Sequence, residues 1–249
     1  MSSSDKDRIY ASKQDKVEDF AFDEYVAGVF ADMIQRSVPG YTALNQLLPL
    51  VANQFIQPNS NVYDLGCSLG EASISIAKSM TKTMARENVN IFAVDNSIAM
   101  IRQLQERLAS IHLEALICPL QDDVTEVEIN NGSFAILNYT LQFVERSKRD
   151  ALIKSICKGL NAGGALLLSE KITHQDENED ALMQRLHENF KRQNDYSEME
   201  ISQKREALEN VLKRDTHEQH IERLHQAGFS KVSILTKYLN FVSYLAIKD

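Results

Sequence analysis

A glycine-bearing turn after a short apolar strand is the first feature of this chain that could hold a ligand. Residues 62–65 are mostly apolar, and the turn Gly66-Cys67-Ser68-Leu69-Gly70 leads into a helical pattern over Glu71–Ser79. Glycine lets the backbone approach a ligand, and a helix N-terminus offers unpaired N–H groups. An ordinary strand-to-helix turn explains an isolated pattern of this kind equally well. Because Ser68 replaces the middle glycine of the pyrophosphate fingerprint, the turn favours a nucleoside sulfonium over a dinucleotide.

Polar residues also follow three later strand-like runs. Asp95 comes after 91–94, the pair Asp122 and Asp123 ends the next apolar region, and Asn138 comes after 134–137. A carboxylate at Asp95 could accept hydrogen bonds from both ribose hydroxyls, and one at Asp123, the favoured acid of the pair, from an adenine amino group. A helix N-cap at Asp95 and a solvated acidic loop at Asp122 and Asp123 are the simpler alternatives. Taken together, these strand ends predict a nucleoside site.

The elements that must position these residues alternate between short apolar runs and helical stretches. Such alternation, with a further run at 165–168, predicts parallel strands joined by crossover helices. Near the end, 231–239 and 240–247 adjoin and must form a hairpin, so one strand runs antiparallel at the sheet edge. The prediction is an α/β fold, a Rossmann-like, seven-stranded methyltransferase sheet that is mostly parallel and ends in an antiparallel hairpin strand.

The segments outside this sheet complete the predicted organisation. Residues 1–19 are polar and unpatterned, which indicates a mobile tail or one ordered only by contact with something else. Residues 20–249 form one domain, in which 20–56 is a helical cap and 173–212 is a charged helical insertion before the last two strands. Insertions at such positions often carry substrate specificity.

Composition restricts the classes of function. The formal net charge of -8 provides no global positive field for nucleic acid, so direct binding of nucleic acid is not expected. The three cysteines are scattered, which fits a reducing compartment, and His and Cys never cluster at metal-ligand spacing, so no metal is expected. No apolar run is long enough to span a bilayer. We therefore expect a cytoplasmic protein that does not act at a membrane.

Five segments of the chain are long or unusual: FDE at 22–24, DMIQRSVPGY at 32–41, YDLGCS at 63–68, LNYTLQF at 137–143 and YSEMEISQKR at 196–205. In these segments the chain resembles the carboxy-S-adenosyl-L-methionine synthases, relatives of class I methyltransferases, and the resemblance runs from about residue 22 to residue 248. Ordinary methyltransferases share the glycine turn but not the segments around 33–41 and 202–205.

The resemblance implies a reaction in which the methyl group of S-adenosylmethionine is carboxylated rather than transferred. Prephenate would be the carboxyl donor, phenylpyruvate would be released, and carboxy-S-adenosylmethionine would supply the modification of a wobble uridine in tRNA. A sulfonium ylide that captures carbon dioxide requires a dry pocket, because water would quench it. The resemblance also implies a homodimer.

The functional residues of the family correspond to positions in this sequence. By resemblance, Arg205 would hold the new carboxylate and is the residue assigned to catalysis, and the cofactor would be bound by Tyr41, Gly66, Cys67, Ser68, Asp95, Asn96, Asp123, Val124, Asn138 and Arg205. From the sequence alone, Arg205 would be a residue of a solvated helix face, and Tyr41 would pack the cap on the sheet.

Several residues differ from those usual in the family. Ala31 and Ala162 replace prolines, Asp195 replaces a glycine, and Glu188 follows His187 in place of the usual residue. Two other functions compete with the synthase. One is a conventional methyltransferase with an unknown acceptor, which would need no carboxylate anchor. The other is a noncatalytic protein that binds S-adenosylmethionine and partners a tRNA-modifying enzyme.

Overall fold

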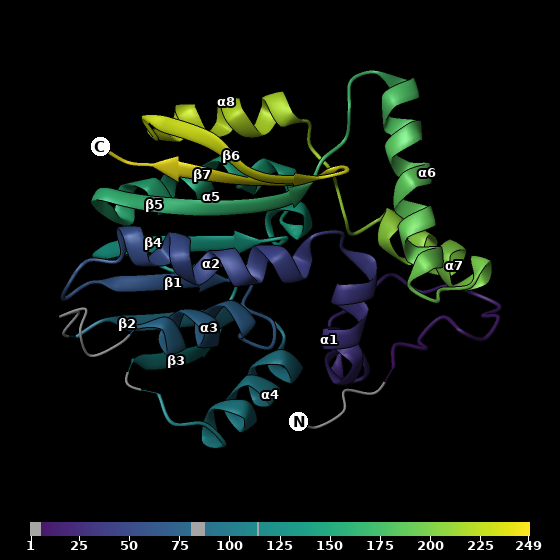
Figure 1. Ribbon diagram of the computed structural model, residues 1–249, viewed down its shortest axis with the longest axis horizontal. Coiled ribbons are helices and arrows are strands. Elements are labelled where there is room, and N and C mark those ends of the chain that lie inside the picture. The colour runs from purple at the N-terminus through teal and green to yellow at the C-terminus, as the bar shows by residue number, and fades with distance from the viewer. Residues whose placement is uncertain (1–5, 81–87, 114) are drawn as a thin grey trace.

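A single seven-stranded sheet forms the centre of the computed structural model, which describes residues 6–80, 88–113 and 115–249 (Figure 1). Its order is β3-β2-β1-β4-β5-β7-β6. In chain order, the strands are β1 Asn61–Leu65, β2 Asn90–Asp95, β3 Leu116–Gln121, β4 Gly132–Asn138, β5 Leu160–Lys171, β6 Lys231–Tyr238 and β7 Phe241–Ile247. The predicted parallel strands and the C-terminal hairpin are confirmed.

The order of the hairpin strands differs from the sequence expectation in one respect. The antiparallel strand is β7, and it lies between β5 and β6 rather than at the edge. Burial explains the exchange, because β7 is buried along most of its length whereas β6 alternates between exposed and partly exposed residues. The more apolar strand takes the interior position, and β6 becomes the edge.

Helices cover both faces of the sheet. Their bounds are α1 Glu24–Ser37, α2 Tyr41–Phe55, α3 Glu71–Ser79, α4 Ile98–Ala109, α5 Arg146–Gly159, α6 Glu177–Gln193, α7 Glu198–Glu209 and α8 His217–Ala227. Apolar residues of α2, α3 and α4 pack in one core cluster with one face of the sheet, and those of α5 and α8 pack in a second cluster on the other. The chain thus has the three layers expected of an α/β protein.

The predicted cap and insertion meet at one end of the sheet. Figure 1 shows α1, α6 and α7 together beyond the end toward which β4 points, which is the carboxyl end of the parallel strands. Helix α1 begins after Asp23, whose side chain accepts a hydrogen bond from the Val26 N–H, and it ends before the turn at Pro39 and Gly40. Ligands of α/β sheets bind at this end, so the added helices can enclose a site there.

The N-terminal segment differs from the mobile tail that its sequence suggested. Residues 1–5 lie outside the described residues, but Asp7 and Tyr10 are buried against the insertion. The Tyr196 hydroxyl donates to Asp7 Oδ2 at 2.5 Å, and the Gln203 amide donates to the Tyr10 carbonyl at 3.0 Å. Side chains of α7 and of the turn before it hold this polar segment, which has no periodicity of its own. The segment is therefore ordered by contact, the second of the two expectations from the sequence.

Membrane insertion has no support from the helices. Within the described part of the chain, none is both long and apolar enough to cross a bilayer.

Candidate functional site

The glycine turn after β1 has a backbone conformation that most residues disfavour. Gly66 and Gly70 have φ values of 83° and 72°, and Ser68 between them has a φ of 49°. The N–H groups of Gly66 and Cys67 both donate to the Val94 carbonyl at 2.8 Å, which fixes the turn against the end of β2. A Cβ atom at Gly66 would overlap the Thr140 side chain. This position therefore requires glycine, and strain at Ser68 is typical of a ligand-binding turn.

Asp95 links the turn to β2. Its Oδ2 accepts from the Ser68 N–H and its Oδ1 from the Ser97 N–H, both at 2.9 Å, and only 8 % of the residue is exposed. Burial raises the pKa of this carboxyl above its usual value. Ser97, rather than Asp95, caps α4 by accepting from the Met100 N–H. The carboxylate is thus free of the capping role that its sequence context suggested and faces the cavity beside Asn96.

The other predicted strand-end residues take distinct positions. Asp123 lines the same cavity as Asp95, whereas Asp122 does not, in agreement with the preference for Asp123. The Asp123 Oδ1 accepts from the Thr125 N–H at 2.8 Å, and Val124, the next residue, is buried. Asn138, the last residue of β4, has a buried Oδ1 without a hydrogen-bond partner among the described residues. An orphaned buried acceptor is costly, so a ligand that donates to this oxygen would offset the cost.

Two adjoining cavities lie at this edge of the sheet. One has a volume of about 470 Å³ and is lined by Tyr41 and Cys67, and the other has a volume of about 810 Å³ and is lined by Asp95 and Asp123. Both are lined by Gly66, Ser68, Asn138, Phe30 and Ile34. They meet at the carboxyl ends of the neighbouring strands β1 and β4, between which the strand order reverses, so the cavities lie at the topological switch point of the sheet.

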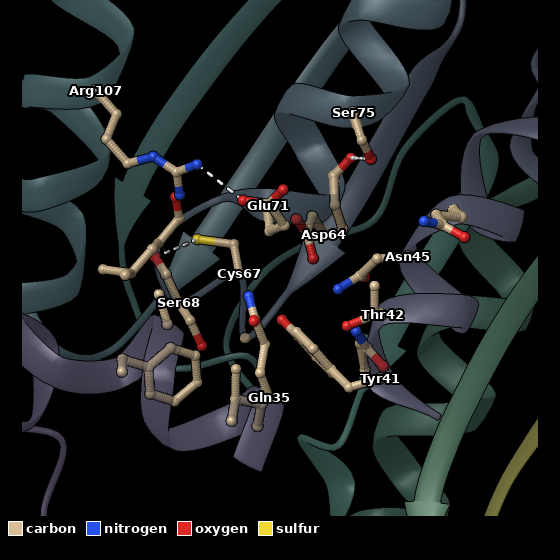
Figure 2. Close-up of a pocket in the computed structure, with 18 of the residues that line it drawn as sticks. Gln35, Tyr41, Thr42, Asn45, Asp64, Cys67, Ser68, Glu71, Ser75 and Arg107 are labelled. Carbon is tan, nitrogen blue, oxygen red and sulfur yellow. Dashed lines mark hydrogen bonds and ion pairs between the residues drawn. The ribbon is translucent and has the colours of Figure 1, made fainter. Parts of the chain in front are cut away.

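The smaller cavity holds a group of polar side chains. Figure 2 shows Tyr41, Asn45 and Asp64 pointing toward one another, with Cys67 nearby. Burial raises the pKa of Tyr41 to about 12 and that of Asp64 to about 6, and burial also raises the pKa of the Cys67 thiol. Near neutral pH the phenol and the thiol are therefore uncharged. The Asn45 Oδ1 is a second buried acceptor without a partner in the described part of the chain.

These observations fit a nucleoside sulfonium. Acceptors at Asp95 and Asp123 suit ribose hydroxyls and an adenine amino group, and the glycine turn with the smaller cavity suits an amino-acid end. Both orphaned amide oxygens, at Asn45 and Asn138, would gain partners from such a ligand. Among the described residues, the structure brings nine of the ten predicted cofactor positions to the two cavities: Tyr41, Gly66, Cys67, Ser68, Asp95, Asn96, Asp123, Val124 and Asn138.

Arg205 is the predicted residue that does not join them within one chain. Its guanidinium forms an ion pair with Glu188 of α6 at 3.1 Å, its side chain is 58 % exposed, and it lines neither cavity. Lys204, the residue before it on α7, points into the larger cavity instead. Glu188, which replaces the residue usual in the family, thus forms the ion pair that holds Arg205 outside the cavities.

The structure shows why a glycine is usual at the position of Asp195. This residue has a φ of 63° and follows the C-terminus of α6, where the Asp195 N–H donates to Arg192 O and the Tyr196 N–H donates to Lys191 O. This pattern is a Schellman motif, whose left-handed residue is most often glycine. A glycine is therefore the residue that this conformation favours.

Sequence reasoning missed several residues that line the cavities. In the sequence pattern Asp64 is part of a strand, and a lone histidine such as His187 is typical of the surface of a helix. Lys171, Lys191 and Lys204 gave no signal because each lies in a charged or strand-like segment. The only available signal was the adjacency of Lys204 to the singled-out Arg205. No group of three or more His, Cys, Asp or Glu side chains suited to a metal ion occurs in the described ranges.

The sheet order, the strained glycine turn and the polar strand ends together define a protein of the methyltransferase fold. A family model described as a methyltransferase domain matches residues 62–164. A putative O-methyltransferase from Nostoc punctiforme has a TM-score of 0.60 at 16 % identity, covering 90 % of this chain and 60 % of its own. Magnesium protoporphyrin IX methyltransferase from Synechocystis has a TM-score of 0.58 at 14 % identity, covering 97 % of this chain and 92 % of its own.

Relatives of higher identity specify the family. The carboxy-S-adenosyl-L-methionine synthase of Idiomarina loihiensis is 46 % identical over 97 % of this chain and 98 % of its own length. The protein of the same name from Yersinia pestis is 44 % identical over 98 % of this chain and 90 % of its own length. The chain belongs to the carboxy-S-adenosyl-L-methionine synthase family, a family of group-transferring enzymes.

Proposed function

We propose that this enzyme converts S-adenosylmethionine and prephenate to carboxy-S-adenosylmethionine and phenylpyruvate. The observation that carries the proposal is the pair of cavities that meet at Gly66, Ser68 and Asn138. A sulfonium at this junction borders the remaining space of the larger cavity, where a second small molecule fits. S-adenosylmethionine is thus a substrate rather than a permanently bound cofactor.

The proposed reaction balances without an added oxidant or metal. The ring carboxylate of prephenate leaves as carbon dioxide, its bonding electrons enter the ring, and the ring hydroxyl departs, which yields phenylpyruvate. The departing hydroxide takes a proton from the S-methyl group and becomes water. The resulting ylide carbon forms a bond to carbon dioxide. Buried walls such as Met33, Tyr139 and Phe241 keep bulk water from this space.

We propose that Arg205 binds the carboxylate of the product as a charge-assisted partner. Because its guanidinium lies outside the cavities of its own chain, this contact requires a second copy of the chain or a movement of α7 away from Glu188. The exposed α6–α7 insertion is accessible to another copy, which supports the proposed homodimer. The acidic chain is not proposed to bind nucleic acid or membranes directly, and its product would supply wobble-uridine modification in the cytoplasm.

The test is mass spectrometry of reactions that contain the purified protein and S-adenosylmethionine, with and without prephenate. We expect a prephenate-dependent species heavier than S-adenosylmethionine by one carbon dioxide, together with phenylpyruvate. Formation of S-adenosylhomocysteine instead, with no carboxylated species, would overturn the proposal.

The position of Arg205 favours a conventional methyltransferase as the second candidate, since such an enzyme needs no carboxylate anchor in the cavity. It would use the same residues for S-adenosylmethionine and transfer the methyl group to an acceptor. The same assay separates the two, because only the synthase depends on prephenate.

A further inference from the structure

Three lysines from three different elements line the part of the larger cavity that lies away from Asp95 and Asp123. Lys171 ends β5, Lys191 lies on α6 and Lys204 lies on α7. Lys191 and Lys204 are only 7 % and 5 % exposed. The strands β1 and β4 separate this end from the cofactor residues of β2 and β3, so the lysines border space that the nucleoside does not fill.

His187 and Ser37 hold two of these lysines in place. The Lys171 Nζ lies 3.3 Å from His187 Nδ1, and His187 Nε2 lies 2.8 Å from the Ser37 carbonyl. Burial, together with the neighbouring lysines, lowers the pKa of His187 to about 2, so the ring is neutral. A neutral ring that donates from Nε2 to Ser37 must accept at Nδ1 from Lys171. The Lys204 Nζ donates to the Ser37 Oγ at 2.9 Å, which ties both lysines to the end of α1.

Lys191 lacks a partner of this kind. Among the described residues its side-chain ammonium has no hydrogen bond or ion pair, although the residue is buried, and the Asp7 carboxylate pairs with Lys204 at 3.4 Å instead. Burial, together with the positive charges of Lys204 and Lys171, lowers the pKa of Lys191 to about 7. An unpaired buried ammonium costs stability and is retained where a ligand supplies the opposite charge.

The same space has an apolar wall. The rings of Phe22 and Phe143 pack edge to face at 5.3 Å, and Phe241 packs edge to face against His187 at 4.9 Å. All three phenylalanines line the cavity. A basic cluster beside apolar rings suits a small molecule that carries carboxylates on a compact unsaturated ring.

We propose that Lys171, Lys191 and Lys204 form the subsite for the carboxyl donor and select a dianion, with Lys191 receiving the second negative charge. This inference rests on the proposed function and adds the residues that bind the donor. One carboxylate can be held by the fixed pair of Lys171 and Lys204, and the unpaired Lys191 discriminates a dicarboxylate such as prephenate from a monocarboxylate such as phenylpyruvate. Replacement of the dianion by a monoanion leaves Lys191 unpaired again, which favours release of the product.

The test is the kinetics of Lys191→Met, which keeps the length of the side chain but removes the charge. We expect the KM for prephenate to rise by roughly tenfold to a hundredfold, because a charge-assisted contact is lost. The dissociation constant for S-adenosylmethionine, measured by calorimetry, stays unchanged. Inhibition by phenylpyruvate weakens less than prephenate binding does, since the monoanion does not need the second charge.

A thermal melt separates this role from a structural one. Removal of an unpaired buried charge leaves the melting temperature of Lys191→Met equal to or above that of the wild type. Lys154→Met, at an exposed position of α5, is the matched control and changes neither the melting temperature nor the KM for prephenate. Lys171→Met provides a second variant in case Lys191→Met does not fold, and it is expected to raise the KM for prephenate as well.

The two proposals fail in different ways. A wild-type enzyme that makes no carboxylated product from prephenate would overturn the proposed function. A wild-type enzyme that makes the product, combined with an unchanged KM for prephenate in the Lys191→Met and Lys171→Met variants, would overturn the lysine subsite alone.

Discussion

The two adjoining cavities form one crevice, and its two ends are built from different kinds of polar group. At the end formed by β1 to β4, backbone N–H groups and the Asp95 carboxylate satisfy one another, and the orphaned groups are neutral amides such as Asn138. At the end formed by β5, α6 and α7, the groups are ammonium ions, of which Lys191 has no partner in the described chain. One end is ready for a nucleoside, and the other carries a charge that only a ligand can balance.

This difference shows how one crevice can bind two substrates, one at preformed hydrogen-bonding groups and the other at an unbalanced charge. Hydrogen bonds that already exist keep the cofactor end ordered without ligand. The cationic end is destabilised until an anion enters, so binding of the donor offsets a cost already present in the fold. Variants at the two ends should therefore differ in which substrate they affect.

The largest effect is expected from Arg205→Ala. Loss of a charge-assisted partner for the carboxylate should reduce formation of the carboxylated product by about 2–3 kcal/mol in transition-state free energy, without a change in S-adenosylmethionine binding. Quantitative mass spectrometry of the product measures the loss, and Arg185→Ala, at an exposed position of α6, is the control. Undiminished product would remove Arg205 from the mechanism.

Mixing two impaired variants shows which cavity Arg205 serves. If it acts on a neighbouring copy, co-expressed Arg205→Ala and Asp95→Ala chains combine an intact Asp95 with an intact Arg205 and recover part of the lost activity. If it acts within its own chain after a movement of α7, the mixture is no more active than the separate variants.

Asp95→Ala should give the next largest effect, at the other end of the crevice. Binding of S-adenosylmethionine weakens by about 1–3 kcal/mol because buried hydrogen bonds to the ribose are lost. Asp95→Asn keeps one acceptor oxygen and should lose less. Calorimetric titration measures both variants, with Glu106→Ala on the exposed side of α4 as the control. Wild-type affinity in Asp95→Ala would exclude the residue from the site.

A smaller effect, confined to the lysine end, is expected from pH. Burial lowers the pKa of Lys191 to about 7 and that of Lys171 and Lys204 to about 8. The charges that act on Lys191 are Lys171, Lys204 and Arg205, which lower its pKa, and Glu188, which raises it. Lys191 is therefore charged below pH 7 and loses its proton above it.

The KM for prephenate should accordingly rise as the pH increases from 7 to 9, by at most about tenfold per pH unit for each lysine. The affinity for S-adenosylmethionine should change little over this range. In Lys191→Met, the rise should begin about one pH unit higher, where the remaining lysines titrate. A pH profile of KM that is flat in the wild type would contradict the subsite.

Asp195→Gly should have the smallest effect, since it lies outside both ends. Its φ of 63° favours glycine, so the free energy of unfolding of the variant is expected to be higher by about 0.5–1 kcal/mol. Its enzyme kinetics should not change. Denaturant melts measure the difference, and Asp195→Ala, which gains no freedom at positive φ, is the control. A lower stability of the glycine variant would show that the exposed ion pair with Lys6 outweighs the backbone strain.

Much of the fold followed from the chain itself because its signals are local. The apolar runs at β1, β2, β4 and β5 and the break between α1 and α2 at Pro39 and Gly40 all match the predicted positions. The predicted position of the antiparallel strand at the sheet edge was wrong, because the relative burial of two adjacent β-rich runs depends on what packs against them. The contacts that hold Gln14 and Tyr10 were also not predictable, since their partner Gln203 lies nearly two hundred residues away.

For the site, sequence alone determined the glycine turn, the acceptors at Asp95 and Asp123 and the position of Asn138, because parallel strands bring their carboxyl ends to one edge. Only the tertiary structure decided that Lys204 faces inward while Arg205 turns out to Glu188. It also decided that Lys171, Lys191 and His187 meet in one cavity. Burial of a charged residue depends on distant segments that exclude water around it, and no local pattern records that exclusion.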